Sequence, residues 1–313
     1  YTGAPITEVV VTVPAYFIAV HQERRKKVFP IIGLVGVTAA VLVSFVLMGG
    51  HLNVLWQPLE FVIIGGSGIF AFMIANPKEV VLKTGGGIGA IFKGPKYKKA
   101  DYLELLTMQY QVFRMAKTKG MLSLEQHVDN PHDSAIFQSF PAFHGDHHAT
   151  EFFCDYLRLM TLGTDNPNEI ETIIDIELDT HHHEADHVAH AINTLAESFP
   201  GLGIVAAVLG VIHTMGSIQE PPEILGGLIA AALVGTFLGI LLCYGFVGPM
   251  AAALKSVREE EHLYFVCLKS GILAHLQGYA PAVTVEFARK CLMSHIRPTF
   301  MEVEEACAEL PPV

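Results

Sequence analysis

Residues 199–255 read FPGLGIVAAVLGVIHTMGSIQEPPEILGGLIAAALVGTFLGILLCYGFVGPMAAALK. Two runs in this stretch, Gly201 to Ile218 and Ile224 to Leu254, contain no Asp, Glu, Lys or Arg. A helix needs about 20 apolar residues to cross the hydrocarbon core of a bilayer. The two runs are therefore predicted to be membrane-spanning helices, joined by the short turn Gln219 to Glu223.

Two more spans are predicted upstream. Phe29 to Met48 carries no charge, and roughly Pro58 to Ala75 has one acid, Glu60, at its start. The whole chain is 51% apolar and 16% charged, with a mean hydropathy of +0.42. An average soluble chain has roughly a quarter of its residues charged. The sequence therefore predicts an all-α, polytopic membrane protein with four transmembrane helices in a lipid bilayer and a helical cytoplasmic domain.

The composition also disfavours several classes of protein. A disordered chain, a collagen-like fibre and a simple soluble enzyme do not need apolar runs of bilayer length. The net charge of −11 argues against a nucleic-acid partner. The five cysteines form no CxxC pair, so they suggest neither a disulfide framework nor a thiolate metal site. No cofactor is expected.

The distribution of basic residues predicts the orientation, because Lys and Arg resist translocation across a membrane. The Gly49 to Gln57 loop and the Gln219 to Glu223 turn contain neither residue, and all 20 Lys and Arg lie in the other three non-membrane segments. Both termini and the long segment after the second span are therefore expected in the cytoplasm. Helical periodicity in residues 101–117 and 168–199, with breaks at 129–131 and 163–168, predicts that this segment is helical.

The expected domain organisation follows from these segments. Residues 1–17, YTGAPITEVVVTVPAYF, form a short β-rich run that resembles a fragment of the Hsp70 ATPase domain, and residues 1–27 are expected to be a leader foreign to the rest, with the protein proper beginning near Val28. The remaining parts are transmembrane helices one and two over 28–75, a cytoplasmic helical domain over 76–199, transmembrane helices three and four over 200–255, and a cytoplasmic helical tail over 256–313.

Polar side chains in the apolar spans are candidates for an ion pathway, since each is costly in lipid unless it faces protein or a pore. Spans three and four offer the hydroxyls of Thr214 and Thr236 and the ring of His213. A hydroxyl bonded to its own helix is an equally good explanation for the threonines. Pro200 and Pro249 are expected to end or kink these helices. No carboxylate lies in spans three and four, so an ion-moving protein would need an acid from a partner chain.

Small residues in span four recur at every fourth position, at Gly227, Ala231, Gly235 and Gly239. Such a stripe lets helix backbones approach closely, which predicts a packing seam. Seams of this kind occur in most polytopic proteins, so the stripe indicates tight assembly and nothing more specific.

The histidines of THHHEADHVAH form a second cluster. His183, His187 and His190 fall on one helical face with Asp186 beside them, a spacing that would suit a divalent metal. No fourth ligand or supporting partner is evident, so a pH-responsive helix surface is the preferred interpretation. The same interpretation applies to His144, His147 and His148.

Six segments taken together resemble the MotA family, the stator subunits of the bacterial flagellar motor. They are FPIIGLVGVTAAV, QPLEFVIIGGSGIFAFMIANP, GMLSLEQHVDNP, FFCDYLRLM, the 199–255 stretch and GYAPAVTVEFARK. The resemblance covers about Val28 to the end. It implies an inner-membrane pentamer around two copies of the single-span partner MotB, which brings the ion-binding aspartate and a peptidoglycan anchor. Ion flow would then drive torque on the rotor protein FliG.

The resemblance also implies roles for particular residues. Pro200 and Pro249 match the family's prolines important for torque, and Thr236 matches its pore threonine. The rotor-facing charges would be Glu125 and a basic residue at Lys117. Arg114 and Lys119 are near enough to substitute for that basic residue. Lys117 and Glu125 would share a face only on an unbroken helix, which Gly120 could interrupt, and an exposed Lys and Glu are more often a plain solvated surface.

Two other functions remain open at this point. An energiser of the ExbB or TolQ type shares the last two spans but normally has three, so the N-terminal hairpin and the GMLSLEQHV segment favour the stator. A membrane-bound metal hydrolase would need an acid or base and a cleft beside the histidines. The expected protein is therefore no enzyme, and residues around GIVAAVLGVIHTMG favour H+ as the transported ion, with Na+ as the alternative.

Overall fold

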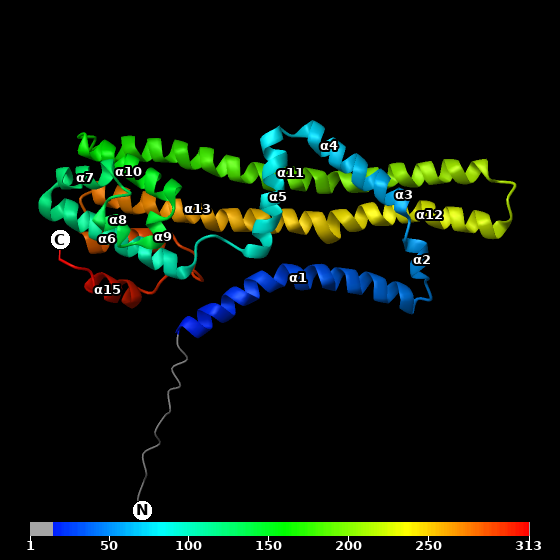
Figure 1. The fold of residues 1–313 in the computed structure, drawn as a ribbon, viewed down its shortest axis with the longest axis horizontal. Coiled ribbons are helices and arrows are strands. Elements are labelled where there is room, and N and C mark those ends of the chain that lie inside the picture. The colour runs from blue at the N-terminus through cyan, green and yellow to red at the C-terminus, as the bar shows by residue number, and fades with distance from the viewer. Residues whose placement is uncertain (1–14, 313) are drawn as a thin grey trace, which may run out of the picture. The chain divides into compact units, whose positions relative to one another are not determined.

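The helices of this chain fall into two units, which are described separately. The computed structural model describes residues 15–312, with side chains from Val28 onward. Over these residues the chain is helical and contains no strand (Figure 1), so the all-α prediction is confirmed. We call residues up to Gly94 together with 190–254 the spanning unit, and residues 95–189 together with Lys255 onward the globular unit.

The unit boundaries differ from the domain boundaries predicted from the sequence. The helix after the second span and residues 190–199 group with the spanning helices, whereas the sequence predicted breaks at 76 and 199. The boundary predicted at 199 is not observed because one uninterrupted helix, residues 167–216, runs through this position. The first helix begins at Ala15 and passes position 27 without a break. The predicted β-rich run lies largely outside the described residues.

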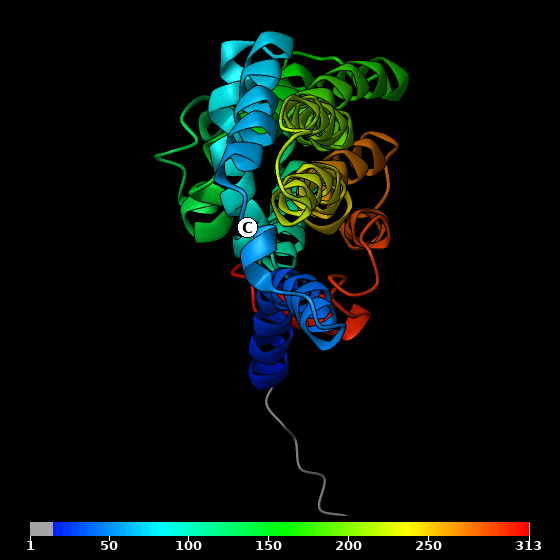
Figure 2. The same ribbon diagram turned by 90° about the vertical axis from the view of Figure 1, so that its right-hand side faces the viewer.

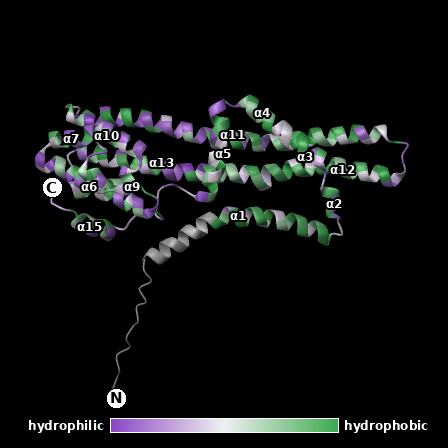
Figure 3. Cartoon of the chain, viewed as in Figure 1, coloured by the Kyte–Doolittle hydropathy of each residue, from purple (hydrophilic) through white to green (hydrophobic). Residues whose placement is uncertain are grey.

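The spanning unit consists of helices and two π-helical turns. They are α1 (Ala15–Leu47), α2 (Leu52–Leu55), α3 (Pro58–Phe61), the π-helical turn η1 (Val62–Gly66), α4 (Ser67–Ala75), α5 (Lys78–Lys93), the second part of α11 (Pro167–Gly216), α12 (Pro222–Leu241), the π-helical turn η3 (Leu242–Val247) and the start of α13 (Gly248–Leu276). Four stretches are long and apolar enough to cross a membrane: Val28–Leu47, Leu52–Ala75, and windows within Pro167–Gly216 and Pro222–Leu276. These match the four predicted spans, and Figure 3 shows the hydrophobic residues along α1 and α12.

The two prolines are accommodated without ending a helix. Pro200 lies inside α11, which continues to Gly216, so the expectation that a helix could end there is wrong. A proline deprives the carbonyl four residues earlier of its helical partner, and membrane helices tolerate this where neighbouring groups compensate. Pro249 follows η3, in which the Gly248 N–H donates to the Cys243 carbonyl. The wider π turn makes room for the proline ring.

The α11–α12 hairpin is held by contact between glycine backbones, and Figure 2 shows these two helices side by side, seen end-on. A Cβ added at Gly203 of α11 would lie 2.7 Å from the Gly235 carbonyl oxygen. A Cβ added at Gly239 would lie 2.5 Å from the Phe199 carbonyl oxygen and 3.0 Å from the Gly203 Cα. Real Cβ atoms do not approach other atoms this closely, so only glycine fits at these positions.

The stripe of small residues is therefore a seam within the chain over part of its length. Gly235 and Gly239 are buried against α11, whereas Gly227 is exposed and has no atom within 4 Å of the position that a Cβ would take. Ala231 is half-buried. The predicted helix packing is thus observed at Gly235 and Gly239, but it joins two helices of one chain, and Gly227 takes no part in it.

The globular unit is built around an aromatic and aliphatic core. Its elements are α6 (Lys99–Lys119), the 3-10 turn η2 (Met121–Leu124), α7 (Glu125–Asp129), α8 (Ala135–Gln138), α9 (Pro141–His144), α10 (His147–Thr161), the first part of α11, the rest of α13, α14 (Pro281–Lys290) and α15 (Phe300–Ala308). Phe113, Phe153 and Leu268 are among its fully buried side chains. The break predicted at 129–131 coincides with the end of α7, and the break predicted at 163–168 with the gap between α10 and the first residues of α11, so both are confirmed.

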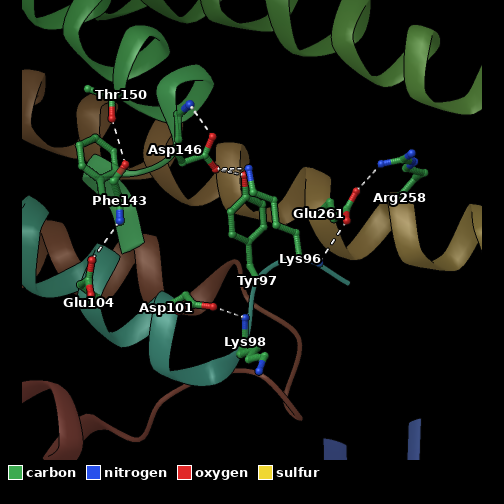
Figure 4. A network of polar contacts seen from close by, with 11 residues as sticks. Lys96, Tyr97, Lys98, Asp101, Glu104, Phe143, Asp146, Thr150, Arg258 and Glu261 are labelled. Atoms are coloured by element: carbon green, nitrogen blue, oxygen red, sulfur yellow. Dashed lines mark hydrogen bonds and ion pairs between the residues drawn. The ribbon is translucent and has the colours of Figure 1, made fainter. Parts of the chain in front are cut away.

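A polar network around Asp146 fixes the segment that leads into α6 (Figure 4). The carboxylate of Asp146 accepts hydrogen bonds from Lys96 Nζ at 2.7 Å and from the Tyr97 hydroxyl at 2.6 Å. The Tyr97 ring stacks on Tyr264 of α13, with 3.8 Å between the centroids. Burial alone would raise the pKa of Asp146, but the hydrogen bonds from Lys96 and Tyr97 outweigh it and hold the pKa below its ordinary value. The network therefore ties the segment to α10 and α13.

Substitution of the glycines should separate the seam from the rest of the stripe. We expect Gly239→Ala to destabilise the protein by about 1–3 kcal/mol, because the new methyl group must displace the Phe199 carbonyl. Gly227→Ala is the matched control: its methyl group meets nothing within the chain, and alanine favours the helix by up to about 1 kcal/mol. Thermal unfolding of the purified protein in detergent checks this. Equal melting temperatures for the two variants would contradict the seam.

Candidate functional site

The polar groups of the α11–α12 hairpin differ in how they are placed. The Thr214 hydroxyl is buried and donates to the Gly210 carbonyl of its own helix at 2.9 Å, which is the alternative that the sequence left open. Thr236 is half-buried, and a Cβ at Gly203 would lie 3.3 Å from its Cα. His213 is exposed on the surface of α11. The structure therefore brings Thr236 to the seam, gives Thr214 a helix-internal bond and leaves His213 outside.

An acid from the second span joins this site. Glu60 of α3 is 8% exposed, and its Oε2 lies 2.7 Å from the position that a Cβ on Gly235 would take. Helix α3 contacts α12. The sequence placed Glu60 at the start of span two and gave it no role. Glu60 is the one acid in an otherwise apolar stretch, and this was the sequence signal for a functional residue. Only the packing of α3 on α12 shows where its side chain lies.

The charged residues expected to face the rotor sit at the end of α6 and the start of α7. Gly120, with φ of 87°, ends α6, and the turn η2 leads to Glu125. The predicted interruption at Gly120 is confirmed, so Lys117 and Glu125 do not share one helix. Lys117, Lys119 and Glu125 are all exposed. They remain available to a partner in the part of the chain that the structure describes.

Two of the basic side chains also brace the globular unit. Arg114 donates to the Pro311 carbonyl and lies over the Tyr110 ring, with 5.7 Å from the guanidinium carbon to the ring centroid. Lys117 donates from Nζ to the Gly278 carbonyl at 3.2 Å. Lys119 has no such role among the described contacts, so a partner could engage it without breaking a bond within the chain.

The histidine face for which the sequence preferred a pH-responsive surface to a metal site forms no metal-binding group among the described residues. His183, His187 and His190 are exposed on α11, and residues 28–312 contain no group of three or more His, Cys, Asp or Glu side chains that could hold a metal ion. A different set approaches on the other side of the helix. His182 lies 4.9 Å from His262, and His181 lies 4.8 Å from His148, between ring centroids.

Two of these half-buried histidines, His181 and His262, have a lowered pKa. Burial, with a further contribution from His148, lowers the pKa of His181. Burial, with contributions from His182 and His181, lowers the pKa of His262. The His182 Nε2 lies 3.5 Å from the Asp186 carboxylate. The pH-responsive surface that the sequence predicted at the exposed histidines stays a prediction.

His275 links the core of the globular unit to Lys117. Its ring stacks on Phe113, with 4.7 Å between centroids and 14° between planes. Burial, with a smaller contribution from Lys117, lowers the pKa of His275 from 6.5 to about 4. The folded protein therefore holds this ring neutral over the physiological range.

Two parts of the chain match families of known proteins. Residues 31–120 match the family model described as Motility protein A N-terminal, and residues 144–265 match the MotA/TolQ/ExbB proton channel family. Motility protein A of Salmonella typhimurium is 43% identical over 275 residues, which cover 88% of this chain and 93% of that protein.

Two solved structures have a similar fold. One is the flagellar MotAB stator complex from Bacillus subtilis, with a TM-score of 0.65 and 26% identity over 82% of this chain and 92% of that one. The other is C. jejuni MotAB, with a TM-score of 0.70 and 19% identity over 85% of this chain and 96% of that one. At 19% identity the second likeness is one of fold alone.

The lowered pKa of His275 predicts acid sensitivity. Above about pH 6.5 the ring is neutral in the folded and the unfolded chain, so its full contribution to stability is present. As the pH falls from 6.5 toward 4, His275 becomes protonated in the unfolded chain but stays neutral in the folded chain. The free energy of unfolding therefore falls by at most about 1.4 kcal/mol per pH unit.

Substitution isolates this contribution from that of the other histidines. His275→Phe keeps an aromatic ring against Phe113 but cannot titrate, so the drop in melting temperature between pH 7.5 and 5.5 should be smaller than in the wild type. Thermal unfolding in detergent at both values measures the difference. Equal drops in the two proteins would show that His275 titrates normally.

Proposed function

The chain belongs to the motility protein A family, and from this membership we propose that it is a stator subunit of a bacterial flagellar motor. With a single-span partner of the MotB type it would form an ion channel and convert ion flow into torque on the rotor protein FliG. The observation that carries the proposal is 43% identity to a motility protein A over 88% of the chain. The output of such a machine is mechanical, so we propose no enzymatic reaction.

The ion pathway would run along the α11–α12 hairpin. The two apolar runs of this hairpin, Gly201 to Ile218 and Ile224 to Leu254, contain no carboxylate, so the ion-binding aspartate would come from the partner and be neutralised near Thr236. Half-burial of Thr236 beside the Gly203 seam supports its position at the pathway. We propose H+ as the ion, with Na+ as the alternative.

Coupling would pass along helices that belong to both units. Helix α11 is continuous from Pro167 to Gly216, and α13 is continuous from Gly248 to Leu276. A change at Pro200 or Pro249 is therefore passed along the same backbone to residues of the globular unit. The missing N–H of each proline leaves a weak point at which a helix can bend.

The rotor would meet the exposed charges of the globular unit. Lys117, Lys119 and Glu125 are exposed, and charge complementarity with FliG would set the contact. Arg114 and Lys117 are each bonded to a backbone carbonyl of the chain. Because Arg114 is half-buried whereas Lys117 and Lys119 are exposed, we assign Arg114 a bracing role and give Lys117 and Lys119 the contact with the rotor.

The proposed assembly is a pentamer of this chain around two MotB chains in the inner membrane, with both termini cytoplasmic. The absence of Lys and Arg from the two short loops supports that orientation. An ExbB or TolQ type energiser is the alternative function. The match of residues 31–120 to a motility protein A model favours the stator.

Substitutions should separate coupling from rotor contact. We expect Pro200→Ala to abolish torque while leaving membrane insertion and assembly intact, because it removes the weak point in α11. Glu125→Lys should weaken rotation without stopping ion leakage through an unplugged channel, since Glu125 is exposed in the globular unit. Rotation of tethered cells and ion leakage measure these effects. Normal torque in Pro200→Ala, or a silent Glu125→Lys channel, would contradict this division.

Labelling tests the orientation. Cysteines introduced at Asn53 and Gln219, both exposed, should react in intact cells with a thiol reagent that cannot cross the inner membrane. A cysteine at Asp133, exposed in the globular unit, should react only after lysis. The wild-type chain, with its own five cysteines, gives the background. Labelling at position 133 in intact cells would overturn the four-span orientation.

A further inference from the structure

Glu60 is a buried acid with an unsatisfied oxygen. It is 8% exposed, and no other acid of the spanning unit is buried among the described residues. Its Oε2 is sealed from solvent and has no hydrogen-bond partner within the described chain. A polar group left in this way costs several kcal/mol in an apolar setting, roughly 2–7 kcal/mol for an unpaired neutral group and far more for a charged one.

Glu60 Oε2 lies beside Gly235, at the point where this glycine approaches α11. The position that a Cβ on Gly235 would take lies 2.7 Å from Glu60 Oε2, 3.0 Å from the Ala206 Cβ and 3.2 Å from the Ala207 backbone nitrogen. The carboxyl group thus sits where α11 and α12 meet. The carboxyl group of Glu60 can reach the seam only because Gly235 has no side chain.

Glu60 lies far along α12 from the polar turn that precedes this helix. Gly235 is thirteen residues after Pro222, the first residue of α12, which is about 20 Å along the helix axis. The chain between them carries one acid, Glu223, in the first turn, and is otherwise uncharged. Glu60 therefore lies inside the apolar run, one residue from the level of Thr236.

We propose that Glu60 is a second proton-binding carboxylate of the channel, contributed by this chain. This inference rests on the proposed function and adds to it an acid that does not come from the partner. Glu60 is neutral at rest with a proton on a carboxylate oxygen, releases that proton toward the acid near Thr236, and takes up the next proton that enters the channel, so that the group is charged only between release and uptake. An ionisable residue buried inside a membrane helix, with no partner in its own chain, is typical of proton pathways.

The test compares acids with their amides in the complex of this chain with its partner. Glu60→Gln keeps the size and hydrogen-bonding capacity of the side chain but cannot carry a proton. We expect it to lower proton flux into vesicles, followed with a pH-sensitive dye under an imposed membrane potential, by roughly tenfold or more. Glu223→Gln, which removes an exposed acid at the start of α12, is the matched control and should retain wild-type flux.

Membrane abundance and co-purification of the partner are measured alongside the flux. If Glu60→Gln fails to accumulate, the pair Glu60→Asp and Glu60→Asn decides, because these side chains have the same shape and differ in the ability to carry a proton. Flux in the Asp variant with loss in the Asn variant supports the relay.

Three results would overturn the inference, and they are distinguishable. Wild-type flux in Glu60→Gln, or equal flux in the Asp and Asn variants, means that Glu60 only donates or accepts a hydrogen bond in the assembly, and the proposed function survives. Absence of both proton and sodium flux from the wild-type complex means that the proposed function itself fails, and the relay fails with it, whereas sodium flux without proton flux overturns the relay alone.

Discussion

Backbone contact between α11 and α12 is the constraint on which the rest of the spanning unit depends. Lipid tails are as apolar as leucine side chains, so helices in a membrane gain little from hiding apolar surface and must associate through close packing. Gly203, Gly235 and Gly239 bring the two backbones within range of each other's carbonyl groups. Phe199 and Leu238 of the same hairpin pack with Ile64 of η1 in a small buried cluster, so the second span is placed by the seam.

The glycines that let α11 and α12 approach each other also leave room for a polar side chain at the seam. A side chain at Gly235 would occupy the space beside the carboxyl group of Glu60, so the glycine that allows close packing also admits an acid to the seam. Thr236 is the next residue. A stripe of small residues thus serves two purposes here: it supplies packing, and it leaves room for groups that would otherwise be unable to enter an apolar hairpin.

Parts of the two long helices, α11 and α13, are packed in the core of the globular unit. Its part of α11 contributes Ile170 and Ile174 to the main core, and its part of α13 contributes Leu268. Lys269 of α13 also bonds to Asp175 of α11, with 2.5 Å from Nζ to the carboxylate oxygen. Because each helix continues into the spanning unit as one backbone, movement at the prolines cannot be absorbed by a loop.

The sequence by itself determined the four spans, the helical class, the break at Gly120 and the family, because these depend on apolar run length, local backbone preference and residue identity. It also identified Gly235 and Gly239, although not the helix they contact. Only the tertiary structure decided that α11 continues through Pro200, that the inner histidines cluster while His183, His187 and His190 do not, and that Glu60 lies against Gly235. The histidine cluster and the contact of Glu60 with Gly235 are relations between residues far apart in the chain. Periodicity within one segment carries no information about which segment packs against it.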